Sequence, residues 1–413
     1  MGRGELDRGE LPCSVELFSG GGGLASALHR AGFRHLLVNE LERRACETLR
    51  ANAVGPLVPG DVRTVDFTGL AGQVDVVAGG VPCQPWSLGG AHRGWEDPRN
   101  LWPELFRCVR ETRPRAVLAE NVRGLLRPTF APYYSYILRE LAHPFERRVD
   151  GEEWHDHDRR LAKAATAGDD AERYDVFCLP VNAADYGVPQ VRRRVFVVAF
   201  RRDLGLADWR PPTPTHSEAA LAAAQADGSY WHRHGLPSAL VSEKERYSVP
   251  FHSRGPWRTL RDAIGDLPEP LGDRVEHPDW LHHFGWPGAR EYHGHTPNEL
   301  DRPAKTVKAG VHGVPGGESV LRRDDGSLRY LTVREVARIM TFPDDWHLAG
   351  PRGEQMRQLG NAVPVRLGQV MATEVYRALT GGRTGRVNPA LGFRMEPPGR
   401  QTVTPCPLPL SDE

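Results

Sequence analysis

The stretch from Val74 to Gln84 constrains the fold of this chain most. It begins with apolar β-branched residues, which predict a buried strand, and Gly79-Gly80 followed by Pro82 ends that strand abruptly. Open α/β sheets bind ligands outside the carboxyl ends of their strands, so we expect Cys83 to face a crevice. A cysteine is otherwise most often a small buried hydrophobic residue. Here the neighbouring residues favour a functional role.

Length and cysteine spacing exclude several classes of protein. The 413 residues are enough for two or three domains. The chain has no apolar run of about 18 residues and no apolar segment after its first methionine, so we expect neither a membrane span nor a signal peptide, and a cytoplasmic location. The six cysteines are scattered, which predicts neither a disulfide framework nor a metal site.

Charge gives only a weak argument about a partner. Lysine plus arginine and aspartate plus glutamate number 53 each, so the overall balance does not indicate a polyanionic partner. Arginines do gather in the sequence around the candidate site, at positions 123, 127, 192 to 194, 201 and 202. Such runs usually form solvated faces, and they favour nucleic acid slightly.

A strand, a glycine turn and a helix follow one another near the N-terminus. Residues 14–18 have a strand pattern, Gly20–Gly23 a turn and residues 24–31 a helical pattern. Glycines let a ligand approach the backbone and a helix N-terminus offers free N–H groups, so a nucleotide-type site is indicated. A second strand, 36–40, ends in an acid close to where a ribose-binding carboxylate is expected.

Helices and strands then alternate, which predicts a parallel sheet covered by helices. The helical patterns cover 43–53 and 101–112, and a further strand pattern covers 116–120. The ligand of such a sheet is a dinucleotide or S-adenosylmethionine, because the fold alone does not decide function. Asp61, after Pro59-Gly60, either meets an exocyclic amine of that ligand or only forms a turn.

Glu120 ends the strand that follows the strand of Cys83 in the sequence. Two neighbouring strands would then deliver a thiol and a carboxyl group to one crevice, which covalent chemistry on a nitrogen-containing ring requires. A surface or capping role is the alternative for Glu120. Farther along, Arg192 and Arg194 precede a buried strand pattern, and in an extended segment both point to one side, where they can reach one anionic group or base edge.

Two regions depart from the alternating pattern. Residues 151–171 are charged and alanine-rich, and we interpret them as an inserted, exposed helix or loop. Residues 201–301 contain nine of the 17 histidines and five of the ten tryptophans, with little periodicity. This predicts a loop-rich second domain whose tryptophans form a small core or stack on bases. Helical patterns return at Thr332, with Glu335 completing a capping box.

Taken together, these residues resemble the DNA (cytosine-5)-methyltransferase family. The resemblance covers about residues 14–200 and 302–379, in the order of the family's motifs. The matching segments are Phe18–Gly23 (cofactor), Pro82-Cys83-Gln84 (nucleophile), Glu120-Asn121-Val122 (second catalytic motif), Gln190–Arg194, Arg302–Val307 and Gly360–Val363. One departure is Leu41, where many members carry a tryptophan that packs against the cofactor.

The resemblance implies a fold and a domain organisation. The fold is α/β, an S-adenosylmethionine-dependent methyltransferase (Rossmann-like) parallel sheet domain with a smaller, loop-rich target-recognition domain. We expect the catalytic and cofactor-binding domain over 12–200, completed by 360–380, and the target-recognition domain over 201–301. A return segment over 302–359 and a disordered tail over 381–413 complete the chain.

The implied reaction is transfer of a methyl group from S-adenosylmethionine to C5 of a cytosine flipped out of double-stranded DNA, through a covalent Cys83–C6 adduct. A cognate restriction endonuclease acting on the same DNA site is an expected partner. The implied catalytic residues are Cys83, Glu120, Arg192 and Arg194. The implied cofactor-binding residues are Phe18, Gly20, Gly22, Gly23, Glu40, Asp61, Pro82, Leu101, Asn361 and Ala362. The implied DNA-binding residues are Gln84, Ser87, Arg99 and Arg192.

Three alternatives remain open from the sequence. A tRNA cytosine-5 methyltransferase can share the fold and the motifs, although the long 201–301 region favours reading of a DNA sequence. A nicotinamide-dependent oxidoreductase would explain the glycines and Glu40 but leaves Cys83, Glu120 and the arginines without a role. A non-catalytic DNA-binding protein is disfavoured by the thiol and carboxyl pair.

Overall fold

The computed structural model describes residues 11–82, 100–164, 169–237, 253–272, 274–291, 293, 296–309 and 319–382. The chain divides into two compact units. The first comprises Met1–Val181, Arg193–Pro212 and Gly368–Glu413, and the second comprises Asn182–Arg192 and Thr213–Leu367. The second unit therefore holds most of the 201–301 region together with the segment that follows it. No helix in the described ranges has both the length and the apolar character needed to cross a bilayer.

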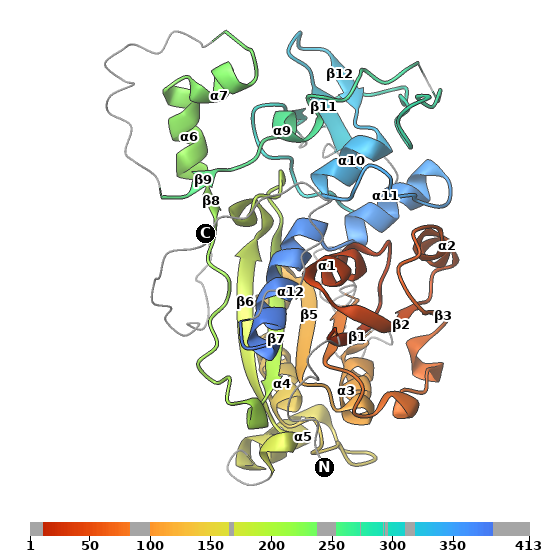
Figure 1. Cartoon of the computed structure of the whole chain (residues 1–413), viewed down its shortest axis with the longest axis vertical. Coiled ribbons are helices and arrows are strands. Elements are labelled where there is room, and N and C mark those ends of the chain that lie inside the picture. Colours follow the sequence, from red (N-terminus) through yellow and green to blue (C-terminus); the bar gives the residue numbers. More distant parts are fainter. Residues whose placement is uncertain are drawn as a thin grey trace. The chain divides into compact units, whose positions relative to one another are not determined.

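A seven-stranded sheet organises the first unit (Figure 1). Its order is β3-β2-β1-β4-β5-β7-β6, and the first five strands are parallel while β7 runs antiparallel to β5. The strands are β1 (Cys13–Leu17), β2 (Arg34–Glu40), β3 (Leu57–Pro59), β4 (Val76–Gly80), β5 (Ala116–Val122), β6 (Tyr174–Asn182) and β7 (Arg193–Arg201). The expected α/β fold with a mostly parallel sheet is confirmed.

The strand order reverses between β1 and β4. From β1 the chain proceeds outward through β2 to β3, and it then returns to β4 on the other side of β1 and continues to β5. Such a reversal leaves a crevice outside the carboxyl ends of the two central strands, where ligands of open α/β sheets bind. The glycine turn after β1 and the Gly79-Gly80 end of β4 both lie at this edge.

Helices pack on the sheet or on one another through apolar faces. They are α1 (Gly23–Ala31), α2 (Arg43–Ala51), α3 (Trp102–Thr112), α4 (Ala131–Ala142), α5 (Trp154–Ala164) and the greater part of α12 (Val365–Leu379). One buried cluster joins strand residues such as Val15 and Val117 to Phe106 of α3 and Ile137 of α4. Elsewhere Tyr376 of α12 meets the edge of the Phe33 ring, with 5.4 Å between the ring centroids. α12 thus completes the first unit from the far end of the chain.

The 151–171 insertion is not simply exposed, and that expectation is wrong for its helix. Trp154, His157 and Leu161 of α5 are 5%, 0% and 0% exposed. Their spacing of three and four residues places them on one face of the helix, while the charged residues between them occupy the other faces. The high charge of the segment concealed this narrow buried stripe.

The second unit is built from short elements and long connections. It contains β8 (His216–Ser217), α6 (Glu218–Ala226), α7 (Ser229–Arg233), β9 (Gly255–Pro256), α9 (Leu260–Ile264), β10 (Asn298–Glu299), β11 (Val320–Arg322), β12 (Leu328–Tyr330), α10 (Val333–Ile339) and α11 (Arg352–Asn361). Among the described residues, β10, β11 and β12 form a small sheet and β8 pairs with β9. The capping box predicted at Thr332 and Glu335 is confirmed.

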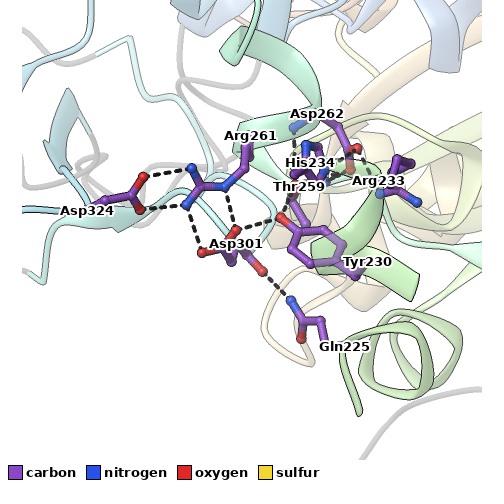
Figure 2. Close-up of polar contacts among 9 residues, drawn as sticks. All are labelled: Gln225, Tyr230, Arg233, His234, Thr259, Arg261, Asp262, Asp301 and Asp324. Carbon is purple, nitrogen blue, oxygen red and sulfur yellow. Dashed lines mark hydrogen bonds and ion pairs between the residues drawn. The ribbon is translucent and has the colours of Figure 1, made fainter. Parts of the chain in front are cut away.

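Arg261 connects several of these short elements (Figure 2). Its guanidinium donates to both carboxylate oxygens of Asp301, at 2.7 and 3.0 Å, and to both of Asp324, at 2.8 and 2.6 Å. Tyr230 of α7 donates to Asp301 at 2.7 Å. Thr259 caps α9 in a capping box with Asp262. Two bidentate ion pairs of this kind fix the geometry of a region that has little regular structure.

Replacing Arg261 with methionine should destabilise the second unit. The Arg261 side chain is 11% exposed and the side chains of Asp301 and Asp324 are 28% and 61% exposed, so the two acids would lose their counter-charge while water only partly replaces it. We expect the free energy of unfolding to fall by about 2 kcal/mol, measured from the thermal unfolding of the whole protein by calorimetry.

Arg322→Met is the matched control. Arg322 is 45% exposed and pairs with the exposed Glu291, so its loss should change the free energy of unfolding by less than about 0.5 kcal/mol. Equal losses in the two variants would contradict a special role for Arg261.

Candidate active site

The turn between β1 and α1 has a backbone that only some residues tolerate. Phe18, Gly20 and Gly22 have φ values of 58°, 53° and 85°. Glycine adopts this left-handed region without strain. Phe18 adopts it with backbone strain, and residues strained in this way cluster at functional sites. The Ser19 N–H donates to the Asn39 carbonyl oxygen of the neighbouring β2 at 3.1 Å, which ties the turn to the next strand.

Glu40 is fixed at the carboxyl end of β2. Its Oε2 accepts the Gly20 N–H at 2.6 Å, and its Oε1 accepts the Glu42 N–H at 2.7 Å. Burial raises the pKa of Glu40, and the N–H donors of Glu42 and Gly20 oppose that effect. Each carboxylate oxygen can accept more than one hydrogen bond. The arrangement therefore suits a ligand that presents hydroxyl groups beside the glycine turn.

Glu16 is an acid at this site that the sequence reasoning missed. It lies in β1 with no exposed surface, and neither carboxyl oxygen has a hydrogen bond of normal geometry among the described residues. Burial raises its pKa well above the usual range, against smaller opposite effects of Ser19 and Ala25. Burial therefore disfavours the charged form of this acid, which lies two residues before Phe18. An acid inside an apolar strand pattern was the available signal.

The remaining predicted cofactor residues take varied positions. Asp61 caps a short turn by accepting the Arg63 N–H at 3.0 Å, so its turn-forming role is present in the structure. Pro82 is half-buried two residues beyond β4, and Leu101 packs against the core immediately before α3. Gly23 begins α1. Asn361 and Ala362, at the end of α11, belong to the second unit.

Glu120 lies beside the end of β4. The parallel register pairs it with Gly80, and a Cβ atom added to Gly80 would lie 3.7 Å from Glu120 Oε2. The Val81 N–H donates to the Glu120 carbonyl oxygen at 3.1 Å. Arg194 of β7 contacts the carboxylate, with 2.9 Å between its Nε and Glu120 Oε1, and both side chains are nearly buried. Glu120 is thus a paired, oriented carboxylate at the crevice edge.

Four predicted residues lie outside the described part of the chain. They are Cys83, Gln84, Ser87 and Arg99, all within residues 83–99. The described backbone stops at Pro82, directly before Cys83, and resumes at Asn100. The roles of these four residues stay predictions.

Arg192 and Arg194 were expected to point together at one group, and the structure gives them different partners. Arg194 pairs with Glu120 in the first unit, as described above. Arg192 belongs to the second unit, where it is 1% exposed. Its guanidinium donates to the carbonyl oxygens of Val307, Gly360 and Ala362 at 2.8, 2.7 and 3.0 Å.

Gln190 supports the same arrangement within the second unit. Its side-chain oxygen accepts the Val307 N–H at 3.0 Å, and Ala304 donates its N–H to the Pro189 carbonyl oxygen at 2.9 Å. Gln190 and Arg192 therefore bring together three segments that the sequence analysis had singled out separately. Buried backbone carbonyls require such donors, which explains an arginine in a buried position.

Gly360 is required by close packing. A Cβ atom there would lie 2.4 Å from the Ala309 nitrogen and 2.5 Å from the Lys308 carbonyl carbon. These are backbone atoms, so a side chain could be accommodated only by moving the chain. The glycine before Asn361 thus allows the end of α11 to lie directly against residues 308–309.

Comparison with known proteins identifies the family. The family model described as C-5 cytosine-specific DNA methylase matches residues 13–143 and 149–377. Among curated relatives, the Type II methyltransferase M.Eco47II of Escherichia coli is 34% identical, over 88% of this chain and 79% of its own. The Type II methyltransferase M.NgoMIV of Neisseria gonorrhoeae is 32% identical, over 89% of this chain and 97% of its own.

Solved structures share the fold at low identity. A protein described as a DNA modification methyltransferase encoded within an E. coli prophage superposes with a TM-score of 0.57 and 19% identity, covering 89% of this chain and 99% of its own. A Spodoptera frugiperda DNMT2 mutant superposes with a TM-score of 0.53 and 16% identity, covering 89% of this chain and 99% of its own. The family match favours the DNA enzyme over the alternatives of a tRNA enzyme, an oxidoreductase and a non-catalytic protein. The chain therefore belongs to the C-5 cytosine-specific DNA methylase family and is a DNA (cytosine-5)-methyltransferase.

Proposed function

We propose that this enzyme takes its methyl group from S-adenosylmethionine and delivers it to a cytosine flipped out of a specific duplex sequence, with Cys83 as nucleophile. The observation that carries the proposal is the buried Glu120–Arg194 pair beside Gly80, at the end of the strand that leads to Cys83. With this register, we expect a thiol that follows β4 in the sequence to share a crevice with the carboxyl group at the end of β5.

The residues of the glycine turn fit S-adenosylmethionine. A Cβ atom at Gly20 would meet no atom of the described residues within 4 Å, which is consistent with space for a ligand beside the turn. We propose that Glu40 binds the ribose hydroxyls and Asp61 the adenine amine, with Phe18, Gly22, Gly23, Pro82 and Leu101 around the cofactor. The roles of Asn361 and Ala362 in cofactor binding stay predictions. When bound, S-adenosylmethionine supplies an electrophilic methyl group.

Cytosine C5 is a poor nucleophile, so the ring must first gain electron density. In the proposed mechanism the Cys83 thiolate forms a bond to C6, which makes C5 nucleophilic. After C5 has gained the methyl group, a base removes the C5 proton, and the electron pair released expels the thiolate. Flipping the base out of the duplex costs a few kcal/mol, which contacts from Gln84, Ser87 and Arg99 are proposed to offset.

Glu120 is proposed to hydrogen-bond N3 and the exocyclic amine of the cytosine, where charge develops during attack. Arg194 holds Glu120 through Oε1, so it orients the carboxyl group and places Oε2 on the side of Gly80. The burial of Arg192 and its packing against three carbonyl groups support an organising role within the second unit instead of the DNA contact expected from the sequence. We propose that the enzyme acts in the cytoplasm on nucleoid DNA, and that a restriction endonuclease cleaves the same unmethylated site.

Cys83→Ser should abolish turnover while preserving the fold, because a hydroxyl is a far weaker nucleophile than a thiolate. Duplex DNA with 5-fluorocytosine at the target should trap wild-type enzyme as a band that survives denaturing electrophoresis, since the fluorine cannot leave as the proton does. Cys178→Ser, which alters a half-buried thiol of β6, is the matched control and should retain activity. Near-normal turnover by Cys83→Ser would end the proposal.

Glu40→Gln should weaken S-adenosylmethionine binding by roughly 10- to 100-fold, because charge-assisted hydrogen bonds of about 1.5–3 kcal/mol are lost. Titration calorimetry measures the change. Glu47→Gln, on the exposed part of α2 where Glu47 pairs with Arg44, is the control and should leave the affinity unchanged. Unchanged affinity in Glu40→Gln would remove Glu40 from the cofactor site.

Specificity for a short DNA sequence is proposed to lie in residues 201–301, apart from the residues that carry the chemistry. Exchanging this region for that of a methyltransferase of another specificity should move the methylated site and keep the reaction. Bisulfite sequencing of DNA from a methylation-free host measures the outcome. An active chimera that still modified the original site would place recognition elsewhere.

A further inference from the structure

The insertion helix α5 is packed against α4 by aromatic rings. The rings of Trp154 and Tyr133 make an edge-to-face contact, with 5.2 Å between centroids and an interplanar angle of 89°. It also contacts Tyr136, at 5.6 Å. All three side chains are buried. Edge-to-face contacts between buried rings fix relative orientation as well as distance.

Polar contacts fix the same pair of helices. His157 shares a hydrogen bond of 2.9 Å with the Tyr136 hydroxyl through Nδ1, and its Nε2 lies 2.6 Å from the Glu146 carbonyl oxygen. Arg139 of α4 donates to both carboxylate oxygens of Asp158 in α5, at 2.7 and 3.0 Å. The insertion is therefore docked on α4 through its buried face and one bidentate ion pair.

α4 in turn holds the residue that precedes α3. The Asn100 side-chain N–H donates to the Tyr133 hydroxyl oxygen at 2.5 Å, and Tyr133 is 4% exposed. The Asn100 side-chain oxygen accepts the Trp102 N–H at 3.4 Å at the start of α3. Asn100 is thus held from two sides, by the first turn of α3 and by a ring that Trp154 buttresses.

The position of Asn100 in the chain gives this contact a consequence. Asn100 directly follows residues 83–99, which contain Cys83 and Arg99, and Pro82 directly precedes them. β4 fixes the first of these two ends through its pairing with β5. At the second end, Tyr133 and the Trp102 N–H hold the Asn100 side chain, and the next residue, Leu101, packs against the core.

We propose that Tyr133, buttressed by Trp154 of the insertion, is a positioning residue for methyl transfer, and that it acts by holding Asn100 where the chain returns from the nucleophile segment. This inference rests on the proposed role of Cys83. Covalent attack is sensitive to displacements of the order of 1 Å between reacting atoms, so a change in where the segment is anchored alters the rate of attack. Cofactor affinity depends on other contacts, because Leu101 is held by the core.

The test is the rate at which enzyme is trapped on duplex DNA containing 5-fluorocytosine. Tyr133→Phe keeps the ring and its contact with Trp154 but removes the acceptor for Asn100. We expect trapping to slow about five-fold, which corresponds to one hydrogen bond, with S-adenosylmethionine and DNA dissociation constants within about two-fold of wild type. Asn100→Ala removes both the donor to Tyr133 and the contact with the Trp102 N–H, so it should slow trapping at least as much, and the double variant should be no slower than Asn100→Ala.

Tyr134→Phe is the matched control. Tyr134 is the next residue of α4 and donates to Cys178 at 2.7 Å, away from Asn100. It should trap at the wild-type rate. A Tyr133→Phe enzyme that trapped as fast as wild type, or a double variant whose defects multiplied, would overturn the inference. Failure of wild-type enzyme to trap at all would instead refute the proposed function.

Trp154→Leu tests the contribution of the insertion. It removes the ring that supports Tyr133 but leaves the Asn100 contact available. We expect slower trapping with unchanged dissociation constants in protein whose far-ultraviolet circular dichroism matches wild type. Wild-type trapping by this folded variant would refute the part of the inference that concerns the insertion.

Discussion

The pairing of β4 with β5 is the constraint on which the site depends. It sets Glu120 opposite Gly80, and the antiparallel β7 then brings Arg194 to the Glu120 carboxylate. A slip of one residue between these strands would turn the Glu120 side chain to the other face of the sheet. The site is therefore specified by the same backbone hydrogen bonds that stabilise the sheet. Gly79 contributes by allowing close approach to the turn after β1, because a Cβ atom there would lie 2.9 Å from the Leu17 carbonyl oxygen.

Local patterns in the sequence were sufficient for much of the first unit. The strand at Val76, the glycine turn and the acid at the end of β2 each depend on neighbouring residues, and each was predicted. The buried face of α5 was not, because three apolar or aromatic residues are obscured by the charges between them. The sequence also could not show which residues far apart along the chain contact each other. Arg192 and Arg194 look equivalent in an extended segment, yet one is surrounded by backbone carbonyls and the other pairs with Glu120.

Both units bury ionisable side chains, and these side chains differ in the groups that they contact. Glu120 has an arginine partner, and Arg192 has carbonyl oxygens. Glu16 has no such partner among the described residues, and burial raises its pKa. Desolvating an unpaired carboxylate is costly, so protonation is the cheaper state for Glu16. The charge of Glu40, on the neighbouring strand, raises the pKa of Glu16 further.

The Arg261 network bears on how recognition regions can be transplanted between relatives. Arg261 and Asp301 lie inside the 201–301 region, but Asp324, the other partner of Arg261, lies beyond it. A graft cut at residue 301 would join an incoming position 261 to a resident turn at 324. If the protein that supplies the exchanged region lacks an arginine at position 261, Asp324 would lose its counter-charge. If that protein pairs its arginine with a different acid, the arginine would not match the position of Asp324. Functional chimeras are therefore easier to obtain when the exchanged segment extends past this turn, so that the recognition region and its electrostatic anchor are inherited together.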